Sequence, residues 1–169
     1  MSCTRAVPAR VGAGYINQMP KKTTQPPAVR PRPGALSLLG SGERRYPKSP
    51  EEARLETFAN PAPGRPYRIT FDCPEFTSLC PITGQPDFAS ISIEYIPNRF
   101  CLESKALKLY LFAFRNQGCF AETIVNRILD DLAAACRPRW MAVTGNFTAR
   151  GGIRISVRAE RGRPPSPRA

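Results

Sequence analysis

The chain has 169 residues, with 25 Lys or Arg, 13 Asp or Glu and no histidine, which gives a formal charge of +12. This length is enough for one domain with a sizeable apolar core. The first 48 residues hold nine Lys or Arg against one Glu, whereas residues 49–153 hold eleven charges of each sign, so the excess charge lies at the ends and gives little support to nucleic-acid binding.

The N-terminal part is rich in proline, since residues 1–66 contain eleven of the nineteen prolines. Proline lacks the backbone N–H that helices and central strands require. We therefore expect residues 1–35 to form a disordered, basic arm, residues 36–160 to form the folded domain, and residues 161–169 to form a basic, Pro-rich tail.

The first predicted strand is short and covers Tyr67–Phe71. A loop rich in Pro and Gly follows, and it carries Cys80 and Asp87. The next strand, Ala89–Ile96, alternates Ile91, Ile93 and Tyr95 with polar residues, which is typical of a half-buried strand.

Two helices come next in the chain. Glu103–Gln117 and Phe120–Ala135 both repeat apolar residues at helical spacing, and Gly118 separates them. Arg139–Phe147 and Gly152–Ala159 are predicted strands, joined by a hairpin turn at residues 148–152.

The predicted order is ββααββ, which indicates an α+β fold with a four-stranded antiparallel sheet and both helices on one face. One sheet face then stays uncovered, and both sheet edges are unpaired. A unit of this kind completes itself by joining neighbours, so we expect a ring-like homo-oligomer with sites at subunit boundaries.

Six cysteines are present, none in a Cys-x-x-Cys pair, and the chain lacks histidine, so we expect no metal site. A chain of this length needs no disulfide framework, and no secretory signal precedes the domain. The sequence contains no apolar run long enough to span a membrane. We therefore expect a reducing, cytoplasmic location.

Cys80 and Asp87 stand seven residues apart and are the leading candidates for chemistry. A cysteine nucleophile normally exchanges protons with an imidazole, which this chain cannot supply. A thiol assisted by a carboxyl group suits attack on an electrophile that takes up a proton as it is attacked. The alternatives are a packed loop cysteine and a turn aspartate that bonds its own backbone.

Other candidate residues lie on the helices and the last turn. Lys105 and Lys108 share a face near a helix N-terminus, and with Arg150 they suggest a phosphate site. Solvated lysines and a plain turn arginine remain the alternatives. Glu122 starts the second helix, where it either complements the helix dipole or binds the N–H edge of a guanine-like base.

Together these residues resemble a known family, the NADPH-dependent 7-cyano-7-deazaguanine reductases of queuosine biosynthesis. These enzymes have the tunnelling fold and are related to GTP cyclohydrolase I. The resemblance covers about residues 39–159 and is carried by Tyr46-Pro47, Phe58–Pro61, Cys73–Cys80, Thr83–Phe88, Glu103–Tyr110, Phe114–Asn116 and Arg150–Gly152.

The resemblance implies a role for each candidate. Cys80 would add to the nitrile carbon to give a thioimide, and Asp87 would protonate the nitrile nitrogen. Leu102, Glu103 and Ser104 match one substrate-binding segment, and Ala121 and Glu122 match another. Lys105, Lys108 and Arg150 would hold the phosphates of NADPH, of which two are consumed per turnover.

One position departs from the well-known members, which have His where this chain has Ala121. Any proton or orienting role at that position is therefore in doubt, although other members also lack the histidine. Two alternative functions remain open at this stage: a nucleic-acid-binding module that uses the basic ends, and an amidinotransferase-like relative that uses Cys80 without hydride. In the reductase interpretation, the partners are a deazapurine and further copies of the chain, and nucleic acid is not required.

Overall fold

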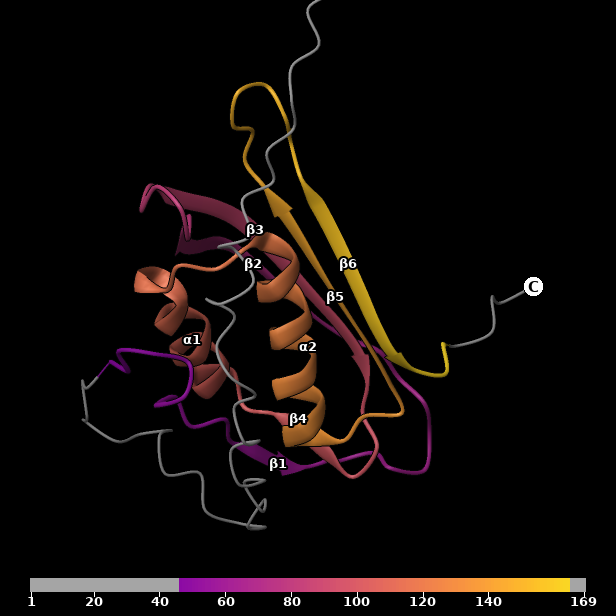
Figure 1. The fold of residues 1–169 in the computed structure, drawn as a ribbon. Helices are drawn as coiled ribbons and strands as arrows, with labels where there is room; N and C mark the ends of the chain where they lie inside the picture. Colours follow the sequence, from indigo (N-terminus) through magenta and orange to yellow (C-terminus); the bar gives the residue numbers. More distant parts are fainter. Residues whose placement is uncertain (1–45, 165–169) are drawn as a thin grey trace, which may run out of the picture.

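The computed structural model describes residues 46–164. Its main sheet is antiparallel and contains β2 (Ile69–Leu79), β3 (Pro86–Ile96), β5 (Trp140–Phe147) and β6 (Ser156–Gly162) in the order β2-β3-β5-β6. The helices α1 (Ser104–Phe112) and α2 (Ala121–Cys136) cover one face of it (Figure 1). The predicted α+β architecture is confirmed, whereas the predicted arm, residues 1–35, lies outside the described residues.

The core lies between this sheet and the helices. The alternation of β3 places Ile91, Ile93 and Tyr95 toward the helices with none of their surface exposed. On α2, Ile124, Ile128 and Leu132 recur at helical spacing and are also buried. The two periodicities therefore meet in one apolar layer, which fixes the register of β3.

The first helix is shorter than predicted. α1 ends at Phe112, and the chain continues as a 3-10 turn, η2 (Ala113–Asn116), rather than as one helix to Gln117. α2 ends where Arg137 takes a left-handed conformation, with φ 46°.

The β2–β3 hairpin is longer than the sequence predicts. β2 continues from the predicted strand through Pro74 to Leu79, and its register shifts between Cys73 and Phe76. An edge strand tolerates proline at such a bulge, because no neighbour needs the missing N–H. The placement of Asp87 in a loop was wrong, since Asp87 is the second residue of β3.

The last strand is also displaced from its prediction. Gly151 and Gly152 have φ of 55° and 82°, and Arg150 and Ile153 exchange backbone hydrogen bonds of 2.9 Å around them. This tight turn pushes β6 toward the C-terminus, to Gly162, inside the residues assigned to the tail. Ile153 is 71% exposed and lies before β6, so the predicted start of this strand at Gly152 was wrong.

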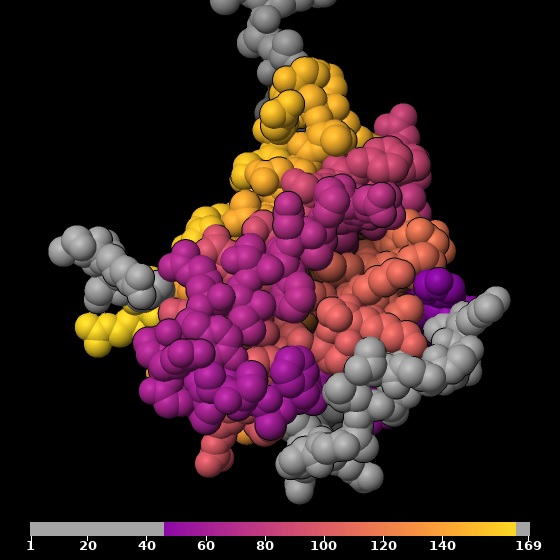
Figure 2. All heavy atoms as spheres, turned by 180° about the vertical axis from the view of Figure 1, so that it is seen from behind, coloured from indigo at the N-terminus to yellow at the C-terminus, as the bar shows by residue number. Residues whose placement is uncertain are grey.

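A second, two-stranded sheet was not predicted. It pairs β1 (Thr57–Ala59) with β4 (Phe100–Leu102). It lies at the end of the molecule opposite the β5–β6 turn, which projects beyond the body (Figures 1 and 2).

The sheet face away from the helices is polar. Arg68 pairs with Glu94 at 3.0 Å, and the indole N–H of Trp140 donates to Glu160 at 3.2 Å. Among residues 46–164, neither helix is both long and apolar enough to cross a membrane.

Candidate active site

Cys80 lies at the tip of the β2–β3 hairpin. Its N–H donates to the carbonyl of Gln85 at 2.8 Å, and its own carbonyl accepts from the N–H of Gly84 at 2.9 Å. Gly84 has φ 69°, a left-handed conformation that suits glycine. The loop therefore closes on itself and fixes the backbone of the candidate nucleophile.

Among the described residues, Cys80 is the cysteine whose thiol pKa is lowered. Hydrogen bonds from the Thr83 side chain, the backbone at Thr83 and Ile82, and Arg150 lower its pKa to about 7. Burial instead raises the pKa of the thiols of Cys73, Cys119 and Cys136. Since the thiolate is the nucleophilic form, Cys80 is the reactive cysteine of this set.

Asp87 and Arg150 complete the group around the thiol. Asp87 faces Ser78 across the β2–β3 ladder. The Arg150 Nε atom lies 3.0 Å from Asp87 Oδ1, and Nη2 donates to the carbonyl of Pro86 at 3.3 Å. Arg150, predicted to bind phosphate, therefore contacts the predicted proton donor in this structure.

The start of α2 lies beside this hairpin. The backbone of Leu79 is hydrogen-bonded to Gln117 at 3.0 Å and to Cys119 at 3.1 Å. This pairing brings Ala121 and Glu122, the first residues of α2, to the same end of the sheet, where Glu122 is exposed. We call this end, with Cys80, Asp87 and Arg150, the hairpin end.

Phe120 is an apolar residue of this end that sequence reasoning missed. It is the N-cap residue of α2 and is 55% exposed. An aromatic residue placed directly before a helix that begins Ala121-Glu122, rather than at a core position of that helix, was the available signal.

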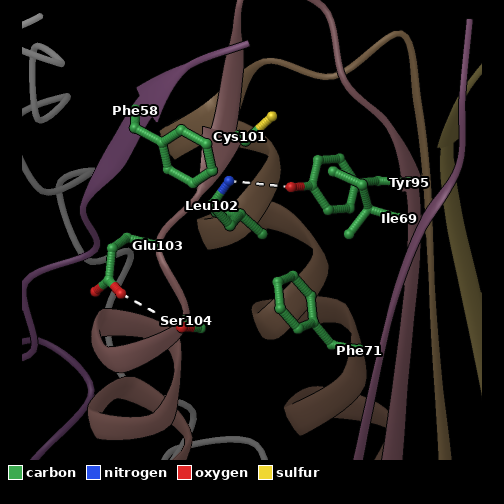
Figure 3. Close-up of a pocket in the computed structure, with 8 residues that line it drawn as sticks. All are labelled: Phe58, Ile69, Phe71, Tyr95, Cys101, Leu102, Glu103 and Ser104. Atoms are coloured by element: carbon green, nitrogen blue, oxygen red, sulfur yellow. Dashed lines mark hydrogen bonds between the residues drawn. The ribbon is translucent and has the colours of Figure 1, made fainter. Parts of the chain in front are cut away.

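The other predicted substrate segment lies in a pocket at the opposite end of the sheet. The pocket has a volume of about 460 Å³, within the range of small-molecule sites. Figure 3 shows its lining: Phe58, Ile69, Phe71, Tyr95, Cys101, Leu102, Glu103 and Ser104. We call this region the pocket end.

The polar groups of the pocket end are largely used by the fold itself. The N–H of Leu102 donates to the Tyr95 hydroxyl at 3.0 Å (Figure 3). Glu103 is only 4% exposed, and its carboxylate caps α1 by accepting from the N–H groups of Lys105 at 2.8 Å and Ala106 at 2.7 Å. The carboxylate of Glu103 therefore serves the helix cap.

This cap corrects one premise of the predicted phosphate site. We expected free backbone N–H groups at the start of this helix, but the carboxylate of Glu103 occupies two of them. Any phosphate held here would depend on the side chains of Lys105, which is half-buried, and Lys108, which is exposed.

A single chain does not bring all the predicted residues together. Pocket residue Phe71 and Cys80 are separated by nearly the whole length of β2, about 30 Å at the rise of an extended strand. Cys80, Asp87, Arg150, Ala121 and Glu122 therefore share the hairpin end, whereas Leu102, Glu103, Ser104, Lys105 and Lys108 share the pocket end.

Within residues 46–164, no group of three or more His, Cys, Asp or Glu side chains is arranged to hold a metal ion. The chemistry that the hairpin end can perform is that of a partly ionised thiol beside a carboxyl group and a guanidinium. This set suits covalent addition with proton transfer.

Comparison with known proteins identifies relatives of this chain. Residues 86–166 match the family model described as "QueF-like protein". A relative from Anaeromyxobacter sp. (strain K), named NADPH-dependent 7-cyano-7-deazaguanine reductase, is 56% identical over 112 residues, which cover 66% of this chain and 92% of the relative. A relative of the same name from Nitrosococcus oceani is 56% identical over 110 residues, covering 65% of this chain and 85% of the relative.

A solved structure also resembles this one. The crystal structure of the archaeosine synthase QueF-Like in its apo form matches with a TM-score of 0.52 and 27% identity. The match covers 59% of this chain and 96% of that one. The similarity therefore extends from sequence to the arrangement of strands and helices.

Proposed function

The chain belongs to the family of NADPH-dependent 7-cyano-7-deazaguanine reductases, and from this premise we propose that it reduces the nitrile of 7-cyano-7-deazaguanine to the aminomethyl group through a thioimide on Cys80. The product would enter queuosine biosynthesis. The observation that carries the proposal is the grouping of an acidified Cys80 thiol, Asp87 and Arg150 at the hairpin end.

The first step is addition of the thiol to the nitrile. The sulfur of Cys80 bonds to the nitrile carbon, one π bond of the triple bond breaks, and the nitrogen takes one proton. Asp87 carries that proton from the thiol to the nitrogen, so no bare nitrogen anion forms. General acid catalysis of this kind contributes about 10²–10⁴-fold to a rate.

NADPH, when bound, supplies a hydride twice, first to the thioimide carbon and then to the imine carbon. Between these deliveries the C–S bond breaks and the Cys80 thiolate leaves, because the electron pair on nitrogen forms the C=N bond. The low pKa of Cys80, about 7, makes that thiolate a good leaving group. One further proton completes the amine on the product nitrogen, and one returns the Cys80 thiolate to the thiol.

The charges of the residues present suit the phosphates of the cofactor. Lys105, Lys108 and Arg150 are the cations proposed to hold its phosphates, and Arg150 also places a positive charge beside the reacting groups. Glu122, exposed at the start of α2, is proposed to accept the N–H edge of the deazaguanine. The exposed ring of Phe120 lies two residues before Glu122 and offers a flat apolar surface to the base.

A neighbouring copy of the chain must complete this site if both substrate segments contact one base. The hairpin end and the pocket end are too far apart in one chain to do so. Head-to-tail contacts that place the pocket end of one copy against the hairpin end of the next generate a ring when the rotation between copies closes. The proposed ring-like homo-oligomer has this arrangement.

The test is to mix the purified protein with 7-cyano-7-deazaguanine and NADPH and to follow cofactor absorbance. We expect oxidation of two NADPH per nitrile, and none with Cys80→Ala. Mass spectrometry without NADPH should show a covalent adduct on wild-type Cys80. Adduct formation without any NADPH oxidation would instead point to the amidinotransferase-like alternative, and full activity of Cys80→Ala would reject the proposal.

The nucleic-acid alternative makes a separate prediction. It requires that deletion of residues 1–35 abolish function and that binding fall steeply with salt. The reductase proposal expects this deletion to leave NADPH oxidation nearly unchanged, because the proposed site residues all lie between Cys80 and Arg150.

A further inference from the structure

Ser78 carries a hydroxyl that the fold leaves without a partner. The residue is 1% exposed, and its Oγ atom makes no hydrogen bond to any of the described residues. A buried polar group left unpaired costs about 1–3 kcal/mol, so nearly all such groups in native proteins have a partner. This hydroxyl therefore points to a hydrogen bond that forms in another state of the protein.

The strand register places this hydroxyl beside the proposed chemistry. Ser78 and Asp87 are direct partners in the β2–β3 ladder. Directly opposed residues project to the same face, with Cβ atoms about 4.5–5.5 Å apart. Cys80 follows Ser78 by two positions, just beyond the end of β2, and Arg150 contacts both its thiol and the Asp87 carboxylate. Ser78, Asp87 and Cys80 thus belong to one cluster at the hairpin end.

Asp87 is held elsewhere in this structure, by the ion pair of its Oδ1 atom with Arg150. A guanidinium donates hydrogen bonds but accepts none, and its charge favours the carboxylate form. Arg150 is therefore unsuited to hold Asp87 while the carboxyl group carries a proton. The other titratable groups at this end are Cys80, Cys119 and, at the start of α2, Glu122.

We propose that Ser78 is a positioning residue for Asp87, and that its hydroxyl is the partner to which the carboxyl group turns when it leaves Arg150 to handle the proton of the reaction. This inference rests on the proposed function of Asp87. The Ser78 O–H donates to the inner carboxyl oxygen and leaves the outer oxygen to carry the proton.

The proton balance is simple. The S–H bond of Cys80 breaks as an O–H bond forms on Asp87; that O–H bond then breaks as an N–H bond forms on the substrate. The Ser78 hydroxyl can donate to the carboxylate, and it can also donate to or accept from the protonated carboxyl group. It therefore holds Asp87 in both protonation states, which Arg150 cannot do.

The test is a titration that does not depend on activity. The full chain, labelled with ¹³C at the carboxyl carbons of its four aspartates, is followed by infrared spectroscopy against pH, and Asp87→Asn assigns the Asp87 band. The titration is made in an Arg150→Gln background, in which Asp87 is free to turn to Ser78.

In that background, Ser78→Ala should shift the carboxylate stretching band of Asp87, because the carboxylate loses a hydrogen-bond donor. Ser78→Thr, which keeps the hydroxyl, should leave the band near that of the background. Thr77→Ala is the matched control, because Thr77 is the neighbouring residue and projects to the other face. An unchanged Asp87 band in Ser78→Ala would overturn the proposal.

A kinetic readout sharpens the same test with Arg150 intact. Ser78→Ala should slow adduct formation on Cys80 about tenfold, from the loss of one hydrogen bond to a charged group. Nitrile binding to the Cys80→Ala protein should be unaffected by adding Ser78→Ala.

Loss of rate and of affinity together, with no shift of the Asp87 band, would mark Ser78 as a structural serine and reject the inference. A wild-type protein that forms no adduct would instead reject the proposed function, and the infrared titration would still decide the place of Ser78.

Discussion

At the pocket end of the sheet, Asn60 and Glu103 are buried and bonded to the protein, whereas at the hairpin end Cys80, Asp87 and Arg150 remain accessible to a ligand. Asn60 is 7% exposed; its side chain donates to the carbonyl of Asn98 at 2.8 Å and accepts from Ala62 and Tyr67. Cys80, Asp87 and Arg150 are half-buried or exposed and contact mainly one another. Polar groups that form hydrogen bonds with each other stabilise the fold. Only groups that can exchange their hydrogen-bond or ion-pair partners are available for chemistry.

The largest expected effect tests whether two copies join these ends into one site. Cys80→Ala at the hairpin end and Lys105→Glu at the pocket end should each reduce NADPH oxidation nearly to background. When the two variants are assembled together at equal amounts, about a quarter of the interfaces should carry both native residues and regain activity. Activity is measured by cofactor absorbance after co-expression.

The control for this mixing experiment is a pair of variants at the same end, Cys80→Ala with Asp87→Asn. Their mixture should regain far less activity, because every hairpin end in it lacks either the Cys80 thiol or the Asp87 carboxylate. No recovery from either mixture would place both ends of each site within one chain, against the proposed assembly.

The next effect is on stability and separates the ends directly. Asn60→Ala removes three hydrogen bonds at a buried position, so the free energy of unfolding should fall by about 2 kcal/mol. Asp87→Asn removes only a partly exposed ion pair, worth about 0–1 kcal/mol. Denaturant unfolding measures both, and an equal loss in the two variants would erase the contrast.

A third prediction compares the two glutamates assigned to the substrate. Glu122→Gln should weaken binding of 7-cyano-7-deazaguanine to the Cys80→Ala protein about tenfold, because a charged acceptor for the N–H edge is lost. Glu103→Gln should instead cost about 1 kcal/mol of folding stability, because Glu103 caps α1 through two N–H groups. Calorimetric titration and denaturant unfolding distinguish the outcomes; weaker binding in Glu103→Gln at unchanged stability would contradict this division.

The smallest effect concerns the pH dependence of the thiol. Its pKa is lowered to about 7, so the fraction of Cys80 present as thiolate increases as the pH rises through 7. Alkylation of Cys80 by iodoacetamide should therefore reach half its maximal rate near that pH. Thr83→Ala removes the largest cause of the lowering, so the midpoint should move to higher pH and the rate at pH 7 should fall several-fold. The modified residue is identified by mass spectrometry.

Cys119→Ala serves as the control for this titration, since burial raises the pKa of the Cys119 thiol and its removal should leave the profile unchanged. A midpoint in the ordinary range for cysteine in the wild type would show that Thr83, Ile82 and Arg150 do not activate Cys80.

Several elements were readable from local pattern alone. The alternation through Ile91, Ile93 and Tyr95 and the helical spacing of Ile124, Ile128 and Leu132 predict one strand and one helix of the core, and the structure confirms both. β6 was misplaced because Ile153 and Ile155 alternate like buried residues, although the Gly151-Gly152 turn holds them outside the sheet.

The sequence by itself determined the sheet and helices, because their periodicities of two and 3.6 are local properties of the chain. It also marked Cys80 and Asp87, since a histidine-free chain leaves few residues for proton transfer. Tertiary structure alone decided which groups are free to react: it buried Glu103 as a helix cap, set Arg150 against Asp87, and left the Ser78 hydroxyl unpaired. The cap itself is a local contact, but the burial of Glu103 and the contact between Arg150 and Asp87 depend on residues distant in the chain, which no local pattern encodes.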